Sequence, residues 1–215
     1  MRVLLLGDTD FGVLQLRQIV AAQDEGALAP DELWVVGTWA DRLPSEPTAS
    51  PGVRLIAEDP ESFLDRALPR LPRRTQIIPP PVAHHLFARW LARASGGSLK
   101  ACGGRWGLPL QVARWDVLYL SAAAWRCPED CQAPTDCPRI AAPRTWDLPG
   151  QIRRMAVVQG LIPLVLEPSG PTSGAEGVRA GRLRAALRLV RRGGAFLIAT
   201  AAPCHAAASM LVVPG

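Results

Sequence analysis

Short apolar runs alternate with helical patterns along the first 95 residues, and this alternation constrains the fold more than any other feature. The apolar runs are typical of strands buried on both faces of a parallel sheet, and they cover Arg2–Gly7, Leu33–Trp39, Val53–Ala57 and Thr75–Ile78. Helices are expected at Phe11–Ala22, where apolar residues recur at helical spacing, at Asp59–Leu68, and after the last strand at Val82–Ala94. The alternation predicts an α/β fold with an open, mainly parallel sheet and helices on both of its faces.

The helix expected at Asp59–Leu68 has the clearest start signal in the chain. Asp59 is a good N-cap residue, Pro60 suits the first helical position, and Glu61 is favourable beside the positive end of the helix dipole. We therefore expect this helix to begin directly after Asp59.

The turn after the first strand is the place where a nucleotide would bind in such a sheet. In the fingerprint G-x-G-x-x-G, Gly7 and Gly12 match the first and third glycines, while Thr9 replaces the second. Asp41, just past the second strand, is a candidate for the acidic position that binds a ribose. Asp8 and Asp10 place negative charge where a diphosphate would lie. The turn therefore predicts either a site for NAD(P) or another nucleotide, or a turn that only preserves the strand–helix geometry.

A proline-rich segment at residues 127–138 carries three cysteines with the spacing C-x3-C-x5-C. The prolines disfavour helix and strand, so something other than regular backbone hydrogen bonding must shape the loop. Thiolates are ligands for zinc and for iron–sulfur clusters, and a remote cysteine would complete a set of four. The predicted metal ligands are Cys127, Cys131, Cys137 and Cys204. Cys102 and His205 are alternatives for the fourth ligand, and the contrary interpretation is that these cysteines are ordinary small apolar residues.

Composition limits the class of protein and its partners. Hydrophobic residues make up 48% of the chain, which is typical of a globular protein. The formal net charge is +5, but the arginines are scattered along the sequence rather than grouped with aromatic residues, so no nucleic-acid partner is expected. A protein partner or a homo-oligomer is compatible with the sequence.

The uncharged window Ala195–Val213 approaches the length of a membrane span. Pro203, Cys204 and His205 interrupt it, and many of its residues are alanine. We expect a buried strand, a tight turn and a short helix here, and no membrane span. The apolar run at the N-terminus is too short for a signal peptide, so a cytoplasmic protein with reduced thiols is expected.

A glycine-rich segment separates the two halves of the chain. Residues 96–106 (GGSLKACGGRW) are expected to be a linker or loop between an α/β domain at residues 1–95 and a second, smaller α/β lobe at residues 107–215. The lobe carries the cysteine-rich loop, and an amphipathic helix is expected at residues 179–192.

Two resemblances extend these predictions. Residues 1–42 resemble the start of a Rossmann-type domain, including the nucleotide-binding regulatory domains associated with potassium transport. The whole chain is similar to an uncharacterised bacterial family that joins such a Rossmann-like N-terminus to a Cys-Pro-x-x-Cys segment, a Pro-Arg pair and a terminal Cys-His pair. The matching residues are Cys127, Pro128, Cys131, Cys137, Pro143, Arg144, Cys204 and His205. The resemblance implies a fold and a cysteine site but no activity.

Two functions follow as hypotheses. The first is a protein that binds a metal or an iron–sulfur cluster through the cysteine-rich loop, with a redox link. The second is a non-catalytic nucleotide-sensing or regulatory domain in which the cysteines are structural. Neither hypothesis names a reaction, so the sequence does not determine whether the protein is an enzyme.

Overall fold

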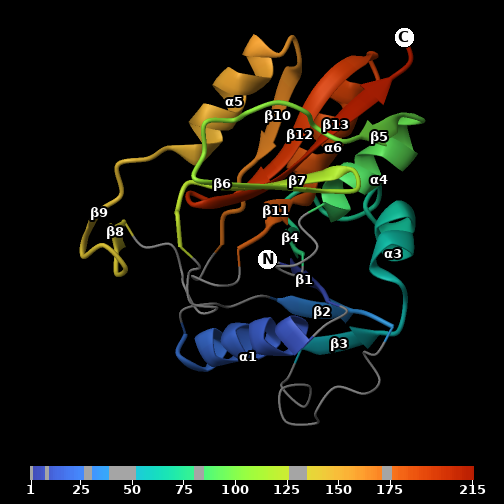
Figure 1. The fold of residues 1–215 in the computed structure, drawn as a ribbon. Helices are drawn as coiled ribbons and strands as arrows, with labels where there is room; N and C mark the ends of the chain where they lie inside the picture. Colours follow the sequence, from blue (N-terminus) through green and yellow to red (C-terminus); the bar gives the residue numbers. More distant parts are fainter. Residues whose placement is uncertain are drawn as a thin grey trace. The chain divides into compact units, whose positions relative to one another are not determined.

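The computed structural model describes residues 2–7, 10–26, 31–38, 52–79, 85–125, 135–170 and 176–215. It is a mixed α/β structure whose sheets are open (Figure 1). The chain divides into two compact units: unit 1 contains residues 1–86 and 169–185, and unit 2 contains residues 87–168 and 186–215. Unit 2 holds slightly more of the chain than unit 1.

Unit 1 is built around a five-stranded sheet in the order β11-β4-β1-β2-β3. Its elements are β1 (Arg2–Leu6), α1 (Asp10–Asp24), β2 (Glu32–Val36), β3 (Val53–Ile56), α3 (Pro60–Ala67), β4 (Gln76–Ile78) and β11 (Val178–Arg179). β1 pairs in parallel with β2 and β4, and β2 pairs in parallel with β3. Only β11 is antiparallel, with Val178 opposite Ile77. The apolar runs of the sequence therefore correctly predict the four parallel strands.

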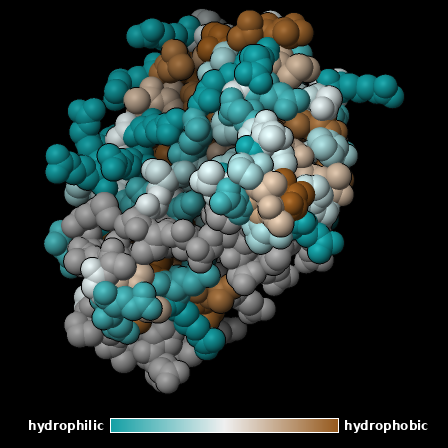
Figure 2. Space-filling model, turned by 90° about the vertical axis from the view of Figure 1, so that its left-hand side faces the viewer, coloured by the Kyte–Doolittle hydropathy of each residue, from teal (hydrophilic) through white to brown (hydrophobic). Residues whose placement is uncertain are grey.

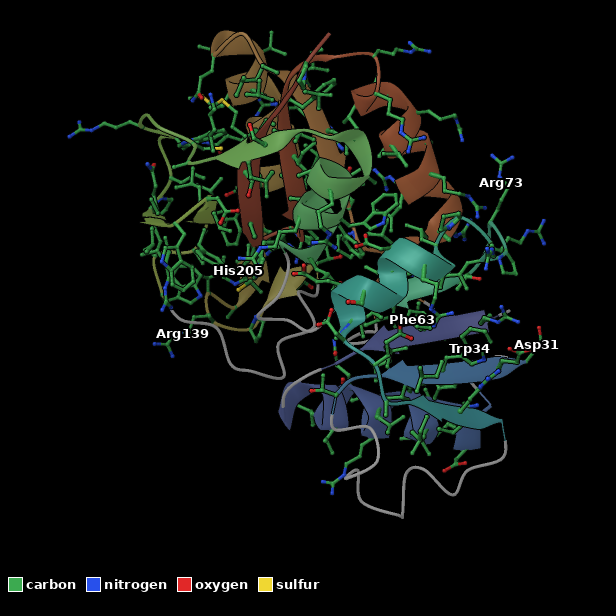
Figure 3. All side chains as sticks on the ribbon, turned by 90° about the vertical axis from the view of Figure 1, so that its right-hand side faces the viewer. Asp31, Trp34, Phe63, Arg73, Arg139 and His205 are labelled. Carbon is green, nitrogen blue, oxygen red and sulfur yellow. The ribbon has the colours of Figure 1, made fainter. Side chains whose placement is uncertain are left out.

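Helices α1 and α3 contact opposite faces of the unit 1 sheet. Leu16 and Ile19 of α1 share a buried cluster with Val3, Leu5 and Leu33. The ring of Phe63 from α3 instead meets that of Trp34 edge-on, with centroids 6.4 Å apart (Figure 3). Neighbouring residues of a strand point to opposite faces, so Trp34 lies on the face away from Leu33 and α1.

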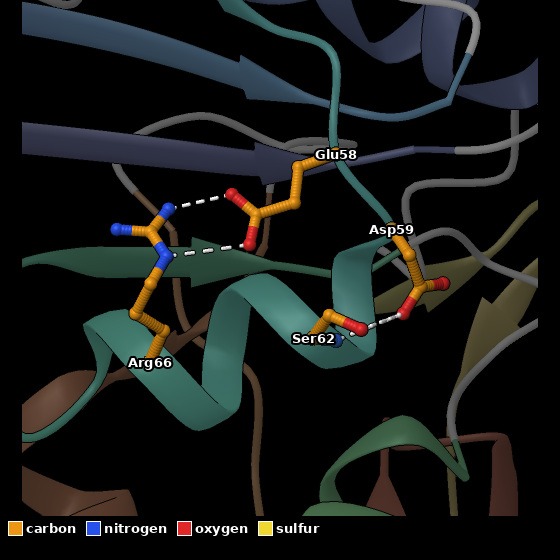
Figure 4. A network of polar contacts seen from close by, with 4 residues as sticks. All are labelled: Glu58, Asp59, Ser62 and Arg66. Carbon is orange, nitrogen blue, oxygen red and sulfur yellow. Dashed lines mark hydrogen bonds and ion pairs between the residues drawn. The ribbon is translucent and has the colours of Figure 1, made fainter.

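Helix α3 begins as the sequence predicts. Asp59 is its N-cap: the Oδ1 atom accepts hydrogen bonds from the backbone N–H of Ser62 at 2.8 Å and from the Ser62 hydroxyl at 2.9 Å (Figure 4). Arg66, one turn further along, donates to both carboxylate oxygens of Glu58, at 2.5 and 3.3 Å. This ion pair raises the pKa of Arg66.

Unit 2 contains a six-stranded mixed sheet in the order β10-β12-β13-β7-β6, with β5 paired to β13. Its elements are α4 (Leu86–Ser95, whose first residue belongs to unit 1), β5 (Ser98–Lys100), β6 (Leu110–Arg114), β7 (Val117–Ser121), β8 (Asp136–Cys137), β9 (Ala142–Pro143), α5 (Leu148–Val158), β10 (Ile162–Leu166), β12 (Gly194–Ala201) and β13 (His205–Val213). Helix α6 (Ala180–Val190) spans the boundary between the units.

The core of unit 2 lies between α5 and one face of this sheet. Alternate residues of β12 and β13 face it, and most of them are alanine, which leaves room for larger residues opposite. Those larger residues include Trp106, Leu148 and Ile152. The loop that holds Trp106 is therefore part of the core.

Two segments differ from the sequence-based prediction. Residues 206–210 form part of β13 rather than a short helix, because Ala206 pairs with Ala201 in a hairpin that continues to Val213. Pairing with both neighbouring strands outweighs the helical preference of the alanines. Helix α5 is not among the predicted helices, although Asp147 caps it and Pro149 lies in its first turn, which is a recognisable start signal.

Candidate functional site

The predicted nucleotide turn lies at the carboxyl edge of the unit 1 sheet. Gly7 follows β1, is buried, and donates its N–H to the carbonyl of Val36 at 2.9 Å. Gly12 is buried in the first turn of α1. Thr9 and Asp41, the other two predicted residues, lie outside the described residues. The N–H of Gly7 extends the pairing of β1 with β2, so this donor is not directed at a ligand.

Two further residues at this edge were missed by the sequence-based prediction. Gly37 follows β2, is buried, and donates its N–H to the carbonyl of Ile56 at 3.1 Å. Thr38 comes next and is exposed. Glycines therefore end two adjacent parallel strands, where the absence of a side chain lets a ligand approach the backbone. The signal was available, because a glycine directly follows each of the apolar runs RVLLL and LWVV.

Toward the opposite, amino edge of the same sheet, two arginine side chains lie over the ring of Trp34. The Arg2 guanidinium lies 4.2 Å from the centre of the Trp34 ring, and that of Arg54 lies 5.2 Å from it. Arg2 also donates to Glu32 at 2.8 Å and thereby lowers the pKa of this carboxyl. The charge of Arg2 is thus neutralised locally, and the Trp34 ring is occupied by protein cations.

The cysteines of the described residues do not form a metal site. Among these residues, no group of three His, Cys, Asp or Glu side chains could hold a metal ion. Cys137 is buried in the β8–β9 hairpin and Cys204 is buried in the turn between β12 and β13, and both are free thiols. Cys127 and Cys131 lie outside the described residues. The predicted zinc or iron–sulfur site is therefore wrong on the described residues: the cysteines that the structure describes are separate buried side chains rather than converging ligands.

The two alternatives for the fourth ligand do not restore the site. Cys102 belongs to the unit 2 core, and burial raises the pKa of its thiol to about 11. His205 is exposed whereas the adjacent Cys204 is buried, so the two side chains lie in different surroundings, as expected on extended backbone.

The loop of Cys102 is fixed by hydrogen bonds from two side chains. Gln111 of β6 donates to the carbonyl of Gly104 at 2.7 Å and accepts from the N–H of Trp106 at 3.0 Å. Gln151 of α5 donates to the carbonyl of Trp106 at 3.1 Å. These contacts hold the glycine-rich segment against the sheet and against α5, with Cys102 and Trp106 directed inward.

At the carboxyl ends of β7 and β12, Ala122 lies beside Cys204. The backbone N–H of Ala122, just past β7, donates to the carbonyl of Cys204 at 3.0 Å. The ring of Trp125 meets that of Trp146 edge-on, with centroids 6.2 Å apart, and the indole N–H groups of both are buried without a partner. His205 lies at the same edge (Figure 3), and although its side chain is exposed by surface area, partial burial of the imidazole lowers its pKa. Two neutral hydrogen-bond donors, the indole N–H groups of Trp125 and Trp146, therefore lie at this edge.

Exposed apolar side chains gather elsewhere on unit 2. Val157 and Val158 at the end of α5, and Ile162 in β10, are exposed, and Figure 2 shows hydrophobic atoms where α5 ends. Nothing in the structure identifies an occupant for this surface.

Comparison with known proteins assigns a family likeness to one part of the chain. Residues 107–213, just under half of the chain, match the family described as "Uncharacterized protein, C-terminal domain". This stretch holds most of unit 2, together with the β11 and α6 segments. The family match supports the expected likeness to an uncharacterised family, but it does not extend to the N-terminal sheet. No curated protein and no solved structure matches the chain.

Within the described ranges, none of the helices is both long and apolar enough to cross a bilayer. The uncharged window at residues 195–213 forms β12, a turn and β13 instead.

Proposed function

We propose that unit 1 is a Rossmann-like domain that binds a nucleotide at the carboxyl edge of its sheet. The observation that carries the proposal is the strand order β3-β2-β1-β4 with all three pairings parallel. From β1 the chain moves outward through β2 to β3, and it then returns to the other side of β1 as β4. Doubly wound sheets bind their ligands at the point where the strand order reverses in this way.

The positions of the helices support the same reading. The contacts of α1 with Leu33 and of α3 with Trp34 put the two helices on opposite faces. A crevice opens between the carboxyl ends of β1 and β4 when successive connections cross on opposite faces. Gly7 and Gly37 line this edge without side chains, and the positive end of α1 begins beside it.

The ligand class follows from the charges in the turn. In the sequence, Asp8 and Asp10 are the acidic residues of the turn motif, and Thr9 replaces the glycine that lets a diphosphate approach in the fingerprint. We therefore expect contacts with the nucleoside to contribute more to binding than contacts with the phosphates. The proposed role is recognition of a nucleotide with a regulatory outcome, like that of the sensing domains which the N-terminus resembles.

A thermal-shift experiment tests this function. The purified protein is melted alone and with about 1 mM NAD, NADP, ATP or adenosine; a ligand whose Kd is near 0.1 mM adds about 1.4 kcal/mol, which raises Tm by roughly 3–6 °C. Adenosine is expected to retain most of the shift given by the best nucleotide. The absence of a shift with all four ligands contradicts the proposal.

Two matched variants locate the site. Thr38→Tyr puts a bulky ring at the carboxyl end of β2, and Asp31→Tyr puts the same ring just before its amino end; both positions are exposed. The first variant is expected to lose the shift and the second to keep it. A shift that survives in Thr38→Tyr, or that disappears in both variants, places the ligand elsewhere.

A further inference from the structure

Exposed arginines from two distant parts of the sequence meet at the amino edge of the unit 1 sheet. Three of them precede β4 and one ends β11, so folding brings together positions about 100 residues apart. We name this group the arginine patch, and its members are Arg70, Arg73, Arg74 and Arg179. Figure 3 shows the side chain of Arg73 directed away from the protein. The patch lies at the end of the sheet opposite to the proposed nucleotide site, so it is independent of that function.

Backbone contacts fix the two segments against each other. Arg179 pairs with Gln76 in the antiparallel ladder of β11 and β4. The N–H of Gly181 donates to the carbonyl of Arg73 at 2.9 Å, and that of Ala180 donates to the carbonyl of Thr75 at 2.9 Å. A Cβ atom on Gly181 would lie only 3.0 Å from the Arg73 carbonyl oxygen, so the close approach depends on glycine. The backbone positions of the two arginine-bearing segments are therefore fixed relative to each other.

A fifth arginine, Arg184, binds the backbone just before the patch arginines of residues 70–74. Arg184 of α6 directs its Nη1 atom at the carbonyls of Leu68, Pro69 and Leu71, at 3.1, 3.3 and 2.6 Å. These carbonyls follow the end of α3 and have no helical partners, so a cation is favourable there. Arg184 thereby fixes the backbone next to the segment that carries Arg70, Arg73 and Arg74.

The two segments that carry the patch, residues 68–79 and 177–185, contain no Asp or Glu. None of the four patch arginines forms an ion pair with a described residue, in contrast to Arg2 and Arg66, which pair with Glu32 and Glu58. Helix α6 begins beside Arg179, and the positive end of its dipole adds to the field.

We infer that the arginine patch binds the phosphate backbone of a nucleic acid. A guanidinium presents a planar fork of N–H donors that matches phosphate oxygens, and a nucleic acid carries closely and regularly spaced negative charges. No large apolar side chain is exposed in residues 68–79 or 177–185, so the surface lacks the residues that insert into a membrane. The sequence-based expectation of no nucleic-acid partner rests on the scatter of arginines along the chain, whereas the fold brings Arg179 to the run that holds Arg70, Arg73 and Arg74.

Fluorescence anisotropy of the full chain tests the inference. The probe is a fluorescein-labelled single-stranded DNA of mixed sequence, titrated at several salt concentrations, and the variant combines Arg73→Ala, Arg74→Ala and Arg179→Ala. The variant is expected to bind about tenfold more weakly or worse at low salt. The slope of log K against log salt is expected to lose about 2, because each phosphate contact on a single strand contributes about 0.7.

The matched control removes the same charge from unit 2. It combines Arg105→Ala, Arg139→Ala and Arg154→Ala, three exposed arginines outside the patch, and is expected to change affinity and slope only slightly. If the patch variant melts at a lower temperature than the control, the double variant Arg73→Ala with Arg74→Ala replaces it.

Three outcomes would overturn the inference. The first is equal weakening of binding in both triple variants, which would show attraction by net charge alone. The second is no DNA binding by the native protein at low salt. The third is patch-dependent binding to vesicles that contain phosphatidylserine but not to DNA, which would assign the patch to a membrane surface.

Discussion

At the residue scale, Trp106 shows how a position in a presumed linker becomes part of a core. Its side chain is 1% exposed and packs in the unit 2 cluster, while both of its backbone polar groups are bound by glutamine side chains. The indole N–H, by contrast, is buried without a partner. Packing of the Trp106 ring therefore stabilises the fold, whereas burial of its indole N–H without a partner destabilises it.

Replacement of Trp106 separates these two contributions. Trp106→Ala is expected to lower the free energy of unfolding by about 3–5 kcal/mol through the cavity it leaves. Trp106→Phe also loses volume, but it removes a buried donor whose desolvation costs about 1–3 kcal/mol, so we expect a net change within about 1 kcal/mol. Urea unfolding followed by circular dichroism measures both variants. A Phe variant as unstable as the Ala variant would show that the indole N–H has a partner, such as a buried water.

His205 predicts a pH dependence of stability. Burial lowers its pKa in the folded protein below the ordinary value of 6.5, so between these two values the unfolded chain binds more protons than the folded protein. Stability should therefore rise with pH up to about 6.5 and gain nothing more from this group above it. Melting temperatures from pH 5 to 8 should show a weaker dependence in His205→Asn than in the native protein, with the difference between the two proteins constant near pH 8. Parallel curves over the whole range would contradict this prediction.

At the element scale, the elements best predicted from the sequence are those whose signals are local. β1, β2, α1 and α3 are each specified by an apolar period or by a start residue within their own segment. β13 was assigned in part to a helix, because its strand pairs with residues on β12 and β7 that no local window contains. The two strand residues of β11 are likewise too few for a periodic signal and depend on β4.

The cap of α3 provides a test at this scale. Asp59→Ala removes the acceptor for the N–H and hydroxyl of Ser62 and is expected to cost about 1 kcal/mol of stability. Asp59→Asn keeps a side-chain oxygen at the N-cap and should recover most of the loss. Thermal or urea unfolding of both variants measures the difference. Equal losses in the two variants would mean that the negative charge matters rather than the hydrogen bond.

At the scale of the whole molecule, the chain passes between the two units three times. Unit 1 takes residues 169–185 from the second half of the sequence, which supply β11 and Arg184. The predicted division into residues 1–95 and 107–215 follows the glycine-rich segment and assigns these residues to the second lobe. A division read along the sequence cannot reveal a strand that returns to an earlier sheet.

A fragment experiment measures how much residues 169–185 stabilise the unit 1 sheet. Residues 1–95 alone lack β11 and the arginine that binds the carbonyls after α3, so we expect the fragment to be less stable than the same segment in the full chain. The full-length variant Arg184→Ala is expected to lose about 1–2 kcal/mol, which is part of the same effect. Amide hydrogen exchange in β1 and β4 reports stability in each protein. Equal protection of these strands in the fragment and in the full chain would contradict the prediction.

The sequence by itself determined the four parallel strands of unit 1, the helices α1 and α3 and the glycine that ends β1, because buried runs, helical periods and caps act over a few residues. Tertiary structure decided the rest. It placed Cys102, Cys137 and Cys204 in separate buried positions, paired β11 with β4, and gathered arginines that lie about 100 residues apart. The physical reason is that the chemistry of a side chain limits the contacts it can make, whereas the packing of the chain determines which residues are near enough to make them.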